Sequence, residues 1–106
     1  MFYYYVYILK CSDNSYYTGI TNNLEKRVKE HQFGFNKDCY TYKRRPLNLK
    51  FYQEFFNDVL QAIYFEKKIK GWSRKKKEAL INKEFDMLQI LSECRNATHY
   101  KYNFEN

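Results

Sequence analysis

The first third of the chain places two β-forming segments and a helix start in close succession, and this order limits the possible folds strongly. Phe2 to Lys10 is rich in β-branched and aromatic residues, and the turn-forming cluster Ser12-Asp13-Asn14-Ser15 follows it. Tyr16 to Thr21 has the same β-forming character. These segments predict an antiparallel hairpin that leads directly into a helix.

The helix after the hairpin has recognisable start and stop signals. Asn22 is the expected N-cap, and Glu25 stands three residues later as the partner that completes a capping box. Gly34 is the expected end of this helix.

Two polar residues of this helix are predicted to lie beside its buried stripe. Leu24 and Val28 are one turn apart and begin that stripe, while Arg27 and His31 are one turn apart next to it. The short connections bring this guanidinium close to the hairpin tyrosines, among them Tyr17. Such a group of side chains can activate a water molecule and bind a phosphate.

The middle of the chain predicts a loop, a third strand and a second helix. Residues 35–46 have no regular period and are predicted as a loop. Leu47 to Phe55 alternates well enough to form a strand. Asn57 is the expected cap of a helix that runs to about Lys70 and is ended by Gly71.

A third short helix and a last amphipathic one complete the predicted elements. Ser73 is the expected cap of a helix from Arg74 to Asn82, and the spacing of Phe85, Leu88 and Leu91 predicts a helix that packs back. The order β-β-α-β-α-α predicts an α+β fold, with a small, mainly antiparallel three-stranded sheet flanked by helices.

Length and composition indicate one domain. With 106 residues the chain can build one core. Residues 1–83 are expected to form it, and residues 84–106 to form a C-terminal helix and tail that pack on it. No segment is long and apolar enough to span a bilayer, and the start lacks the basic residues of a signal peptide. We therefore expect a cytoplasmic protein without a membrane partner. Three cysteines without a Cys-x-x-Cys pair favour reduced thiols over a disulfide framework or a zinc site.

The charge of the chain favours a polyanionic partner. The net charge is +7, and seven of the residues from Glu66 to Lys77 are basic while one is acidic. A solvated helix face is the simpler explanation, but the absence of compensating acids favours nucleic acid. The 12 Tyr, 9 Phe and one Trp can stack on bases, although core packing is the more common use of each ring. The residues expected to contact nucleic acid are Lys43, Arg44, Arg45, Lys67, Lys70, Arg74, Lys75 and Lys76.

One carboxylate is predicted to lie on the apolar face of the second helix. At 100° per residue, Val59, Ala62, Ile63 and Ile69 fall within an arc of roughly 120° that should meet the sheet. Glu66 falls inside this arc. Because an unpaired buried carboxylate is costly, it needs a cation, a proton or water.

Two interpretations of Glu66 remain open at this point. It can form a structural ion pair with Lys70 one turn on, or with Arg27 in the core. Alternatively it can hold a metal ion at the floor of a cleft, an interpretation that gains weight because Arg27 and His31 are expected at a similar stripe edge.

These residues together resemble a known family. The GIY-YIG nuclease domain carries its motif residues in the same order and with similar spacing, over about Phe2 to Asn82 of this chain. The small stand-alone bacterial members, often described as similar to the excision-repair nuclease subunit, resemble this chain most in the stretch Leu24 to His31 and in the lysine-rich run after Glu66. The elements that carry the resemblance are Tyr5-Val6-Tyr7, Tyr17-Thr18-Gly19, Arg27, His31 and Glu66.

The chain departs from the family pattern at two positions. Tyr5 replaces a glycine in the first triad, and Thr18 replaces an isoleucine in the second, both substitutions that a strand tolerates. Many members also carry a polar residue after the glutamate, for which Asn82 is the nearest candidate here.

The resemblance implies metal-dependent hydrolysis of DNA phosphodiester bonds, in DNA repair or in the processing of branched DNA. Glu66 would hold one Mg²⁺ or Mn²⁺ ion, and no small-molecule cofactor is expected. Arg27 would neutralise a non-bridging oxygen. Tyr17 or Tyr7 would help to take the proton from the attacking water, and His31 would assist the proton or the phosphate. The sequence does not decide which of the two tyrosines acts as the base.

Two other function classes compete with a nuclease. The first is a non-catalytic nucleic-acid-binding module with the same fold, which would not require a carboxylate in a basic cleft. The second is a protein-interaction module, which the basic clusters disfavour.

Overall fold

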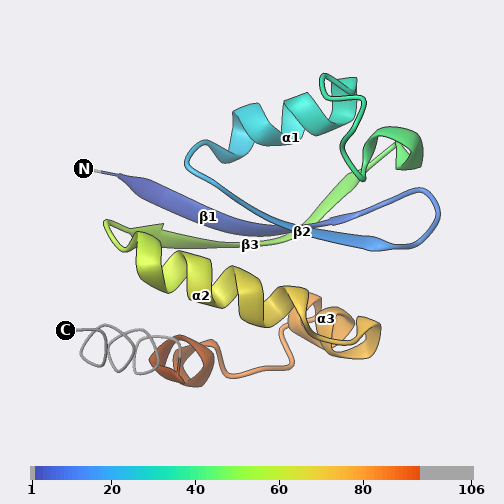
Figure 1. Ribbon diagram of the computed structural model, residues 1–106. Coiled ribbons are helices and arrows are strands. Elements are labelled where there is room, and N and C mark those ends of the chain that lie inside the picture. The colour runs from blue at the N-terminus through green and yellow to red at the C-terminus, as the bar shows by residue number, and fades with distance from the viewer. Residues whose placement is uncertain (1, 94–106) are drawn as a thin grey trace.

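The computed structural model describes residues 2–93 and shows a three-stranded antiparallel sheet between layers of helices (Figure 1). The strand order is β2-β1-β3, so β2 and β3 form the two edges. The elements are β1 (Tyr3–Lys10), β2 (Tyr16–Thr21), α1 (Leu24–Phe33), a short 3₁₀ helix η1 (Tyr42–Arg44), β3 (Asn48–Phe56), α2 (Val59–Lys70) and α3 (Arg74–Ile81). Residues 87–93 are also helical. The predicted α+β fold is confirmed.

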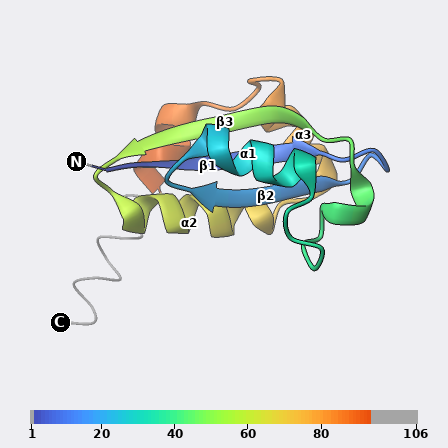
Figure 2. The same cartoon turned by 90° about the horizontal axis from the view of Figure 1, so that it is seen from above.

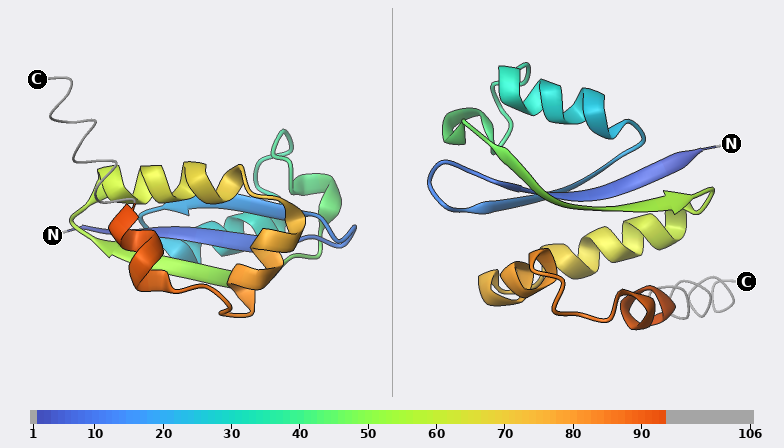
Figure 3. Two further views of the ribbon diagram at one scale, coloured as in Figure 1. Left: turned by 90° about the horizontal axis from the view of Figure 1, so that it is seen from below. Right: turned by 180° about the vertical axis from the view of Figure 1, so that it is seen from behind.

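The helices cover opposite faces of the sheet. Helix α1 lies on one face, whereas α2, α3 and residues 87–93 lie on the other (Figure 1). Seen from above, α1 lies over the sheet with β2 and β3 on either side (Figure 2). From below, α2 runs along the β2 side (Figure 3), and it packs against both β2 and β1. Edge strand β2 therefore has α2 beneath it on one face and the layer that contains α1 above it on the other.

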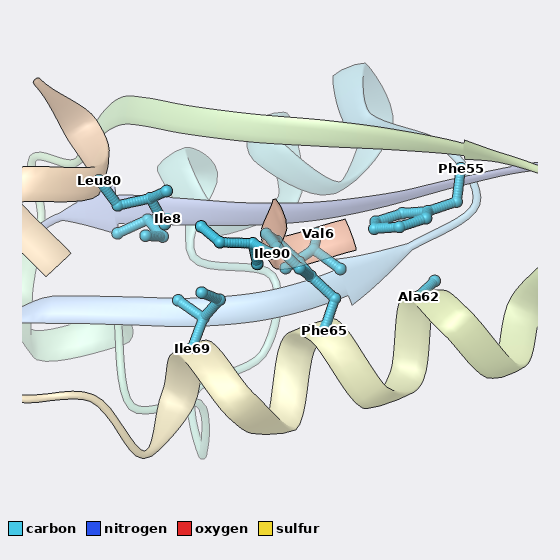
Figure 4. Packing of buried hydrophobic residues seen from close by; sticks show 8 residues of the cluster. All are labelled: Val6, Ile8, Phe55, Ala62, Phe65, Ile69, Leu80 and Ile90. Carbon is cyan, nitrogen blue, oxygen red and sulfur yellow. The ribbon is translucent and has the colours of Figure 1, made fainter. Parts of the chain in front are cut away.

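The main core lies between the sheet and the helices beneath it. Even-numbered residues of β1 point down into this core, because side chains alternate along a strand. Each buried large apolar side chain stabilises the fold by about 1.5–3 kcal/mol. The core consists of Val6, Ile8, Phe55, Ala62, Phe65, Ile69, Leu80 and Ile90 (Figure 4). The burial of Ile90 shows that residues 87–93 pack on the same domain.

A smaller cluster lies on the α1 face of the sheet. Tyr7, Leu9, Cys11 and Leu47 are buried there, with Leu24 and Val28 of α1 among the side chains packed against them. Alternation along β1 thus sends Tyr7 toward α1, on the face opposite the main core.

Two predicted helix caps are one residue too early. The N-cap of α1 is Asn23, whose side chain accepts from the Lys26 N–H, and the N-cap of α2 is Asp58. Each helix is preceded by two capping residues in succession, and the side chain that reaches the first turn decides between them. Asn57 instead adopts a positive φ of 51° in the turn before α2.

The other boundaries from β1 to α3 agree with the sequence or differ by one residue, but the last helix begins at residue 87, and Leu88, which was predicted to pack back, is 80% exposed because Ile90 faces the core instead. Gly34, Gly71 and Ser73 take their predicted cap positions. Strand β3 begins at Asn48 rather than Leu47, because the Leu47 backbone N–H donates to the side-chain oxygen of Gln32. Cys94 and the tail lie outside the described residues. None of the helices within residues 2–93 combines the length and the apolar character needed to cross a membrane.

Candidate active site

Side chains from β1, β2 and α1 meet on the α1 face of the sheet. Tyr7 Oη lies 3.0 Å from His31 Nε2, at hydrogen-bond distance. The ring centroid of Tyr17 lies 5.1 Å from that of His31 and 6.3 Å from that of Tyr7. The two hairpin tyrosines therefore lie directly beside His31 of α1.

Gly19 makes room for Tyr7. It pairs with Tyr7 across the hairpin, and a Cβ at position 19 would lie 2.4 Å from Tyr7 Oη. Such a contact is far inside van der Waals distance. The glycine of the second triad is therefore required by the side chain of the first.

His31 is a buried, neutral partner for the tyrosine. Its side chain is 4% exposed, and its Nδ1 lies 2.8 Å from Thr41 Oγ1. Burial, and secondarily the charge of Arg27, lowers the pKa of His31 to about 4. At neutral pH the imidazole is uncharged, so His31 does not bind phosphate as a cation. Of its two expected roles, this leaves assistance to the proton transfer.

The two tyrosines differ in accessibility. Tyr7 is 1% exposed, and burial, together with the neighbouring phenol of Tyr17, raises its pKa to about 12. Tyr17 is half-buried, and its pKa is also raised, mainly by burial and then by Cys39. Arg27 acts in the opposite direction on both phenols. Of the two, Tyr17 is the one that a water molecule can reach from solvent.

Arg27 lies at the mouth of the site, where its guanidinium interacts with Tyr7, Tyr17 and Glu30. One N–H, at Nη1, donates to Glu30 Oε1 at 3.2 Å, and the side chain is 34% exposed. A guanidinium carries five N–H donors in a planar fork. Arg27 can therefore keep this half-exposed ion pair and still offer a donor pair to a phosphate.

Glu66 approaches the same tyrosine from α2. Its Oε2 is buried without a hydrogen-bond partner, and residues 2–93 provide no ion pair for it. The carboxylate lies close enough to Tyr17 to raise the pKa of that phenol. Because α2 packs along edge strand β2, Glu66 reaches Tyr17 at this edge of the sheet. The predicted structural ion pairs with Lys70 and Arg27 are absent from the part of the chain that is described.

The buried arc of α2 is rotated relative to the prediction. Ala62, Phe65 and Ile69 are fully buried, whereas Val59 is 39% exposed and Ile63 is half-buried. The arc turns because Phe65, the largest apolar side chain, fills the core between Phe51 and Phe55. Glu66 stays at the border of the arc, half-buried.

The donor set at Glu66 fits one hard cation that keeps most of its water. A buried carboxylate oxygen without a partner costs about 1–3 kcal/mol or more, and a cation removes that cost. Within residues 2–93, no three His, Cys, Asp or Glu side chains converge into a metal site. An ion here would therefore have Glu66 as its protein ligand and water elsewhere, which Mg²⁺ accepts.

The predicted nucleic-acid contacts divide into two groups. Six side chains are exposed, namely Lys43, Lys67, Lys70, Arg74, Lys75 and Lys76. Arg44 and Arg45 are partly buried in intramolecular contacts. Arg44 pairs with Asp13 at 3.1 Å, and Arg45 donates to the backbone oxygen of Tyr42 at 2.9 Å. These two arginines hold the loop after α1 in place. Asn82 ends α3, where its backbone N–H donates to Glu78 O.

Three site residues come from the segment that was predicted only as a loop. Thr41 contacts His31, and Cys39 Sγ lies 3.4 Å from Thr41 Oγ1. Tyr40 stacks on Tyr17 with ring centroids 6.1 Å apart. These residues follow no helical or strand periodicity that would place them beside His31. Their polar and aromatic character was the only sign in the sequence that they could belong to the site.

Comparisons with known proteins identify the family of this chain. The model of the GIY-YIG catalytic domain matches residues 3–79. A UPF0213 protein of Staphylococcus haemolyticus is 47% identical over 77 residues, which are 73% of this chain and 92% of that protein. A UPF0213 protein of Clostridium perfringens is 49% identical over 78 residues, or 74% of this chain and 82% of that protein.

One similar protein has a solved structure. The solution NMR structure of the UPF0213 protein BH0048 from Bacillus halodurans is 39% identical, covers 76% of this chain and 83% of that one, and has a TM-score of 0.49. The match to the family model, over residues 3–79, includes all five candidate catalytic residues, Tyr7, Tyr17, Arg27, His31 and Glu66. This chain belongs to the GIY-YIG family, among relatives that are small UPF0213 proteins.

Proposed function

We propose that this chain is a divalent-metal-dependent endonuclease that hydrolyses phosphodiester bonds in DNA. The observation that carries the proposal is the buried Glu66 oxygen without a partner, next to Tyr17. Membership of the GIY-YIG family supports nuclease chemistry in general. The metal, the DNA substrate and the residue roles are our proposal.

Glu66 holds the metal ion, one Mg²⁺ or Mn²⁺, through the oxygen that lacks a partner. When bound, the ion supplies charge stabilisation for the phosphate and the leaving 3′ oxygen. The protein contributes the carboxylate of Glu66, which is half-buried next to edge strand β2, and water would supply the remaining ligands that Mg²⁺ prefers.

Arg27 binds a non-bridging oxygen of the scissile phosphate. Its remaining N–H donors form a fixed fork that matches two phosphate oxygens, and its charge is permanent. Donors already held in place at the site need no reorganisation as charge develops, and this is the usual source of a large rate effect.

Tyr17 takes the proton from the attacking water. Tyr17 is half-exposed, whereas Tyr7 is 1% exposed and already contacts His31. Burial raises the pKa of Tyr17, and the charge of Arg27 opposes that rise, so the phenolate that this step needs depends on Arg27. The Tyr7 and His31 pair remains neutral and orients Tyr17 by packing against its ring.

A nuclease of this size fits a role in DNA repair or in the processing of branched DNA, within the cytoplasm. A non-catalytic nucleic-acid-binding module is the alternative. Binding alone would be served by the exposed lysines and gives no reason for an unpaired carboxylate at a buried position, so the nuclease explains more of the site.

Metal-dependent cleavage of labelled DNA tests the proposal. Branched, nicked and linear DNA, and RNA of the same sequence, are incubated with the protein in Mg²⁺, in Mn²⁺ or in EDTA. We expect cleavage by wild type with either metal and none in EDTA. Glu66→Gln should abolish cleavage while the fold and the DNA affinity stay nearly unchanged.

Glu84→Gln is the control, because it makes the same change at an exposed carboxylate after α3. It should cleave as wild type does. Glu66→Gln should also be as stable as the metal-free wild type or slightly more stable, since it removes an uncompensated buried charge. Wild-type turnover by Glu66→Gln would refute the metal-ligand role, and strong loss of stability without metal would indicate a structural ion pair instead.

A further inference from the structure

Two phenylalanines at the end of α1 are exposed and stacked on each other. Phe33 is 67% exposed and Phe35 is 72% exposed, with ring centroids 6.0 Å apart and ring planes at 22°. The exposed aromatic area of such a pair is costly in water unless something covers it.

The fold explains the backbone of this turn but not the exposed ring. Gly34 has a φ of 67°, and the N–H of Phe35 donates to the oxygen of Glu30 at 3.2 Å, as in a Schellman motif. In that motif an apolar residue after the glycine usually packs back on the helix. Here the facing helix position is Glu30, and Phe35 stays exposed.

Phe35 lies beside the phosphate-binding arginine. It lines a pocket of about 130 Å³ together with Arg27, His31 and Tyr42. Its other side lines a hollow of about 370 Å³ on the outer surface of α1. The ring therefore stands between the candidate active site and the exposed surface of α1.

The charged groups around the outer hollow are of both signs. Lys26 and Lys29 are exposed there, and Glu25 pairs with Lys29 at 3.2 Å. Glu30 lines both the pocket and the hollow and pairs with Arg27 at 3.2 Å, while Lys26 on the outer side and Arg27 on the inner side supply the positive charge beside Phe35. An aromatic platform flanked by cations matches an unpaired nucleotide, which has an apolar π-face and an anionic backbone.

We propose that Phe33 and Phe35 form a stacking platform for an unpaired nucleobase next to the phosphate held by Arg27. The inference rests on the proposed function, and it adds that the preferred substrate carries unpaired nucleotides at the cleavage site. A base inside a duplex is stacked on both faces and cannot lie on Phe35. A single strand, a flap or a fork presents a free face.

Binding measured without cleavage tests this inference separately from the chemistry. Fluorescence anisotropy in EDTA compares a labelled single-stranded DNA with a duplex of the same sequence whose two ends are closed by non-nucleotide linkers, so that it presents no unpaired base. Phe35→Ala should bind the single strand about tenfold more weakly or worse, the scale of one lost base–aromatic stack, and should bind the closed duplex as wild type does.

Three further variants separate stacking from other effects. Phe2→Ala, at a side chain that is 63% exposed near the far end of β1, should leave both affinities unchanged. Phe35→Trp should keep the affinity for single strands. Phe35→Leu, which is apolar but not aromatic, should lose it.

The possible results point to different conclusions. If Phe35→Ala binds both DNAs as wild type does, or loses both equally, the platform is refuted even while Glu66-dependent cleavage stands. Full affinity of Phe35→Leu for single strands also refutes stacking. A wild type that binds neither DNA overturns both the platform and the proposed function. If light scattering shows a dimer that Phe35→Ala dissociates, the pair is an interface between copies and the platform is refuted.

Discussion

Arg27 combines a fixed charge with a fixed geometry, and the two contributions can be separated by substitution. Its ion pair with Glu30 is worth at most about 1 kcal/mol at this exposure, so losing that pair costs little stability. Arg27→Lys keeps the charge but loses the fork, which matters only if two parallel donors meet the phosphate. We expect both Arg27→Lys and Arg27→Ala to cleave about a hundredfold more slowly or worse, in single-turnover assays with Mg²⁺ at saturating protein.

The comparison for Arg27 is Arg74→Lys, which makes the same change at an exposed arginine of the basic run. It should cleave at nearly the wild-type rate. A lysine variant at position 27 within a few-fold of wild type would remove Arg27 from the catalytic set.

The buried imidazole of His31 makes stability depend on pH in a defined direction. Its pKa falls from 6.5 to about 4 on folding, so between these values the unfolded state binds a proton that the folded state does not. The stabilisation is fully present above pH 6.5 and is lost as pH falls toward 4, by about 3 kcal/mol.

Urea denaturation of wild type and His31→Gln at a series of pH values measures this contribution. All other titrating groups are common to both proteins, so the difference between the two curves reports His31 alone. We expect the free energy of unfolding of wild type to fall more steeply between pH 6.5 and 4 than that of the variant. Parallel curves would contradict the low pKa.

At the scale of elements, the close contact between β1 and β2 requires a glycine at position 19, opposite Tyr7. A Cβ on Gly19 would lie 2.4 Å from Tyr7 Oη and 2.6 Å from Tyr7 Cζ, and the buried Tyr7 ring has little space to retreat. Gly19→Ala should destabilise the protein by about 1–3 kcal/mol, the usual cost of overpacking, and should slow cleavage by moving Tyr7 from His31.

Gly71→Ala provides the comparison for Gly19→Ala. A Cβ there would make contacts of 3.7 Å, and the φ of −81° suits any residue. That variant should therefore be as stable as wild type or slightly more stable. Equal unfolding free energies for the two alanine variants would show that Tyr7 adapts freely.

The elements were predictable from sequence because their signals are local. Alternation along β1, the capping residue Ser73 and the glycine ends at Gly34 and Gly71 depend on neighbours within a turn. The choice between Asn22 and Asn23 was not predictable, since both are good caps and only the first turn geometry separates them.

The part of the site built by residues 35–46 depends on tertiary contacts. Thr41 meets His31, and Tyr40 stacks on Tyr17, only because Arg44 and Arg45 hold the loop against the body of the domain. Neither arginine carries a sequence signal for that role, and both were expected to bind nucleic acid. The choice of Tyr17 rather than Tyr7 as the proposed base likewise rests on how exposed each side chain is, and alternation along a strand does not give that exposure.

At the scale of the whole molecule, a run of exposed basic residues follows Glu66 along the chain. Lys67 and Lys70 are exposed on α2, and Lys75 and Lys76 are exposed on α3, which continues from it. Helix α2 also positions Glu66 beside β2. These exposed lysines thus lie on the two helices that cover the face of the sheet opposite α1, beginning one residue after Glu66 (Figure 1).

This arrangement predicts binding that is electrostatic and nearly independent of base sequence. Each phosphate that a lysine or arginine neutralises adds roughly −0.9 to the slope of log affinity against log salt. If five of the exposed basic residues engage, affinity for duplex DNA should fall about 500-fold between roughly 50 and 200 mM salt.

Lys75→Gln or Lys76→Gln should each reduce the steepness of the slope by about one unit, whatever the DNA sequence. Lys50→Gln, at an exposed lysine on edge strand β3, should not change it, because β2 and the proposed metal site lie at the other edge. The measurement is anisotropy titration at several salt concentrations with two unrelated duplexes. A flat salt response, or a strong preference for one duplex, would mean that DNA is held by specific contacts rather than by this surface.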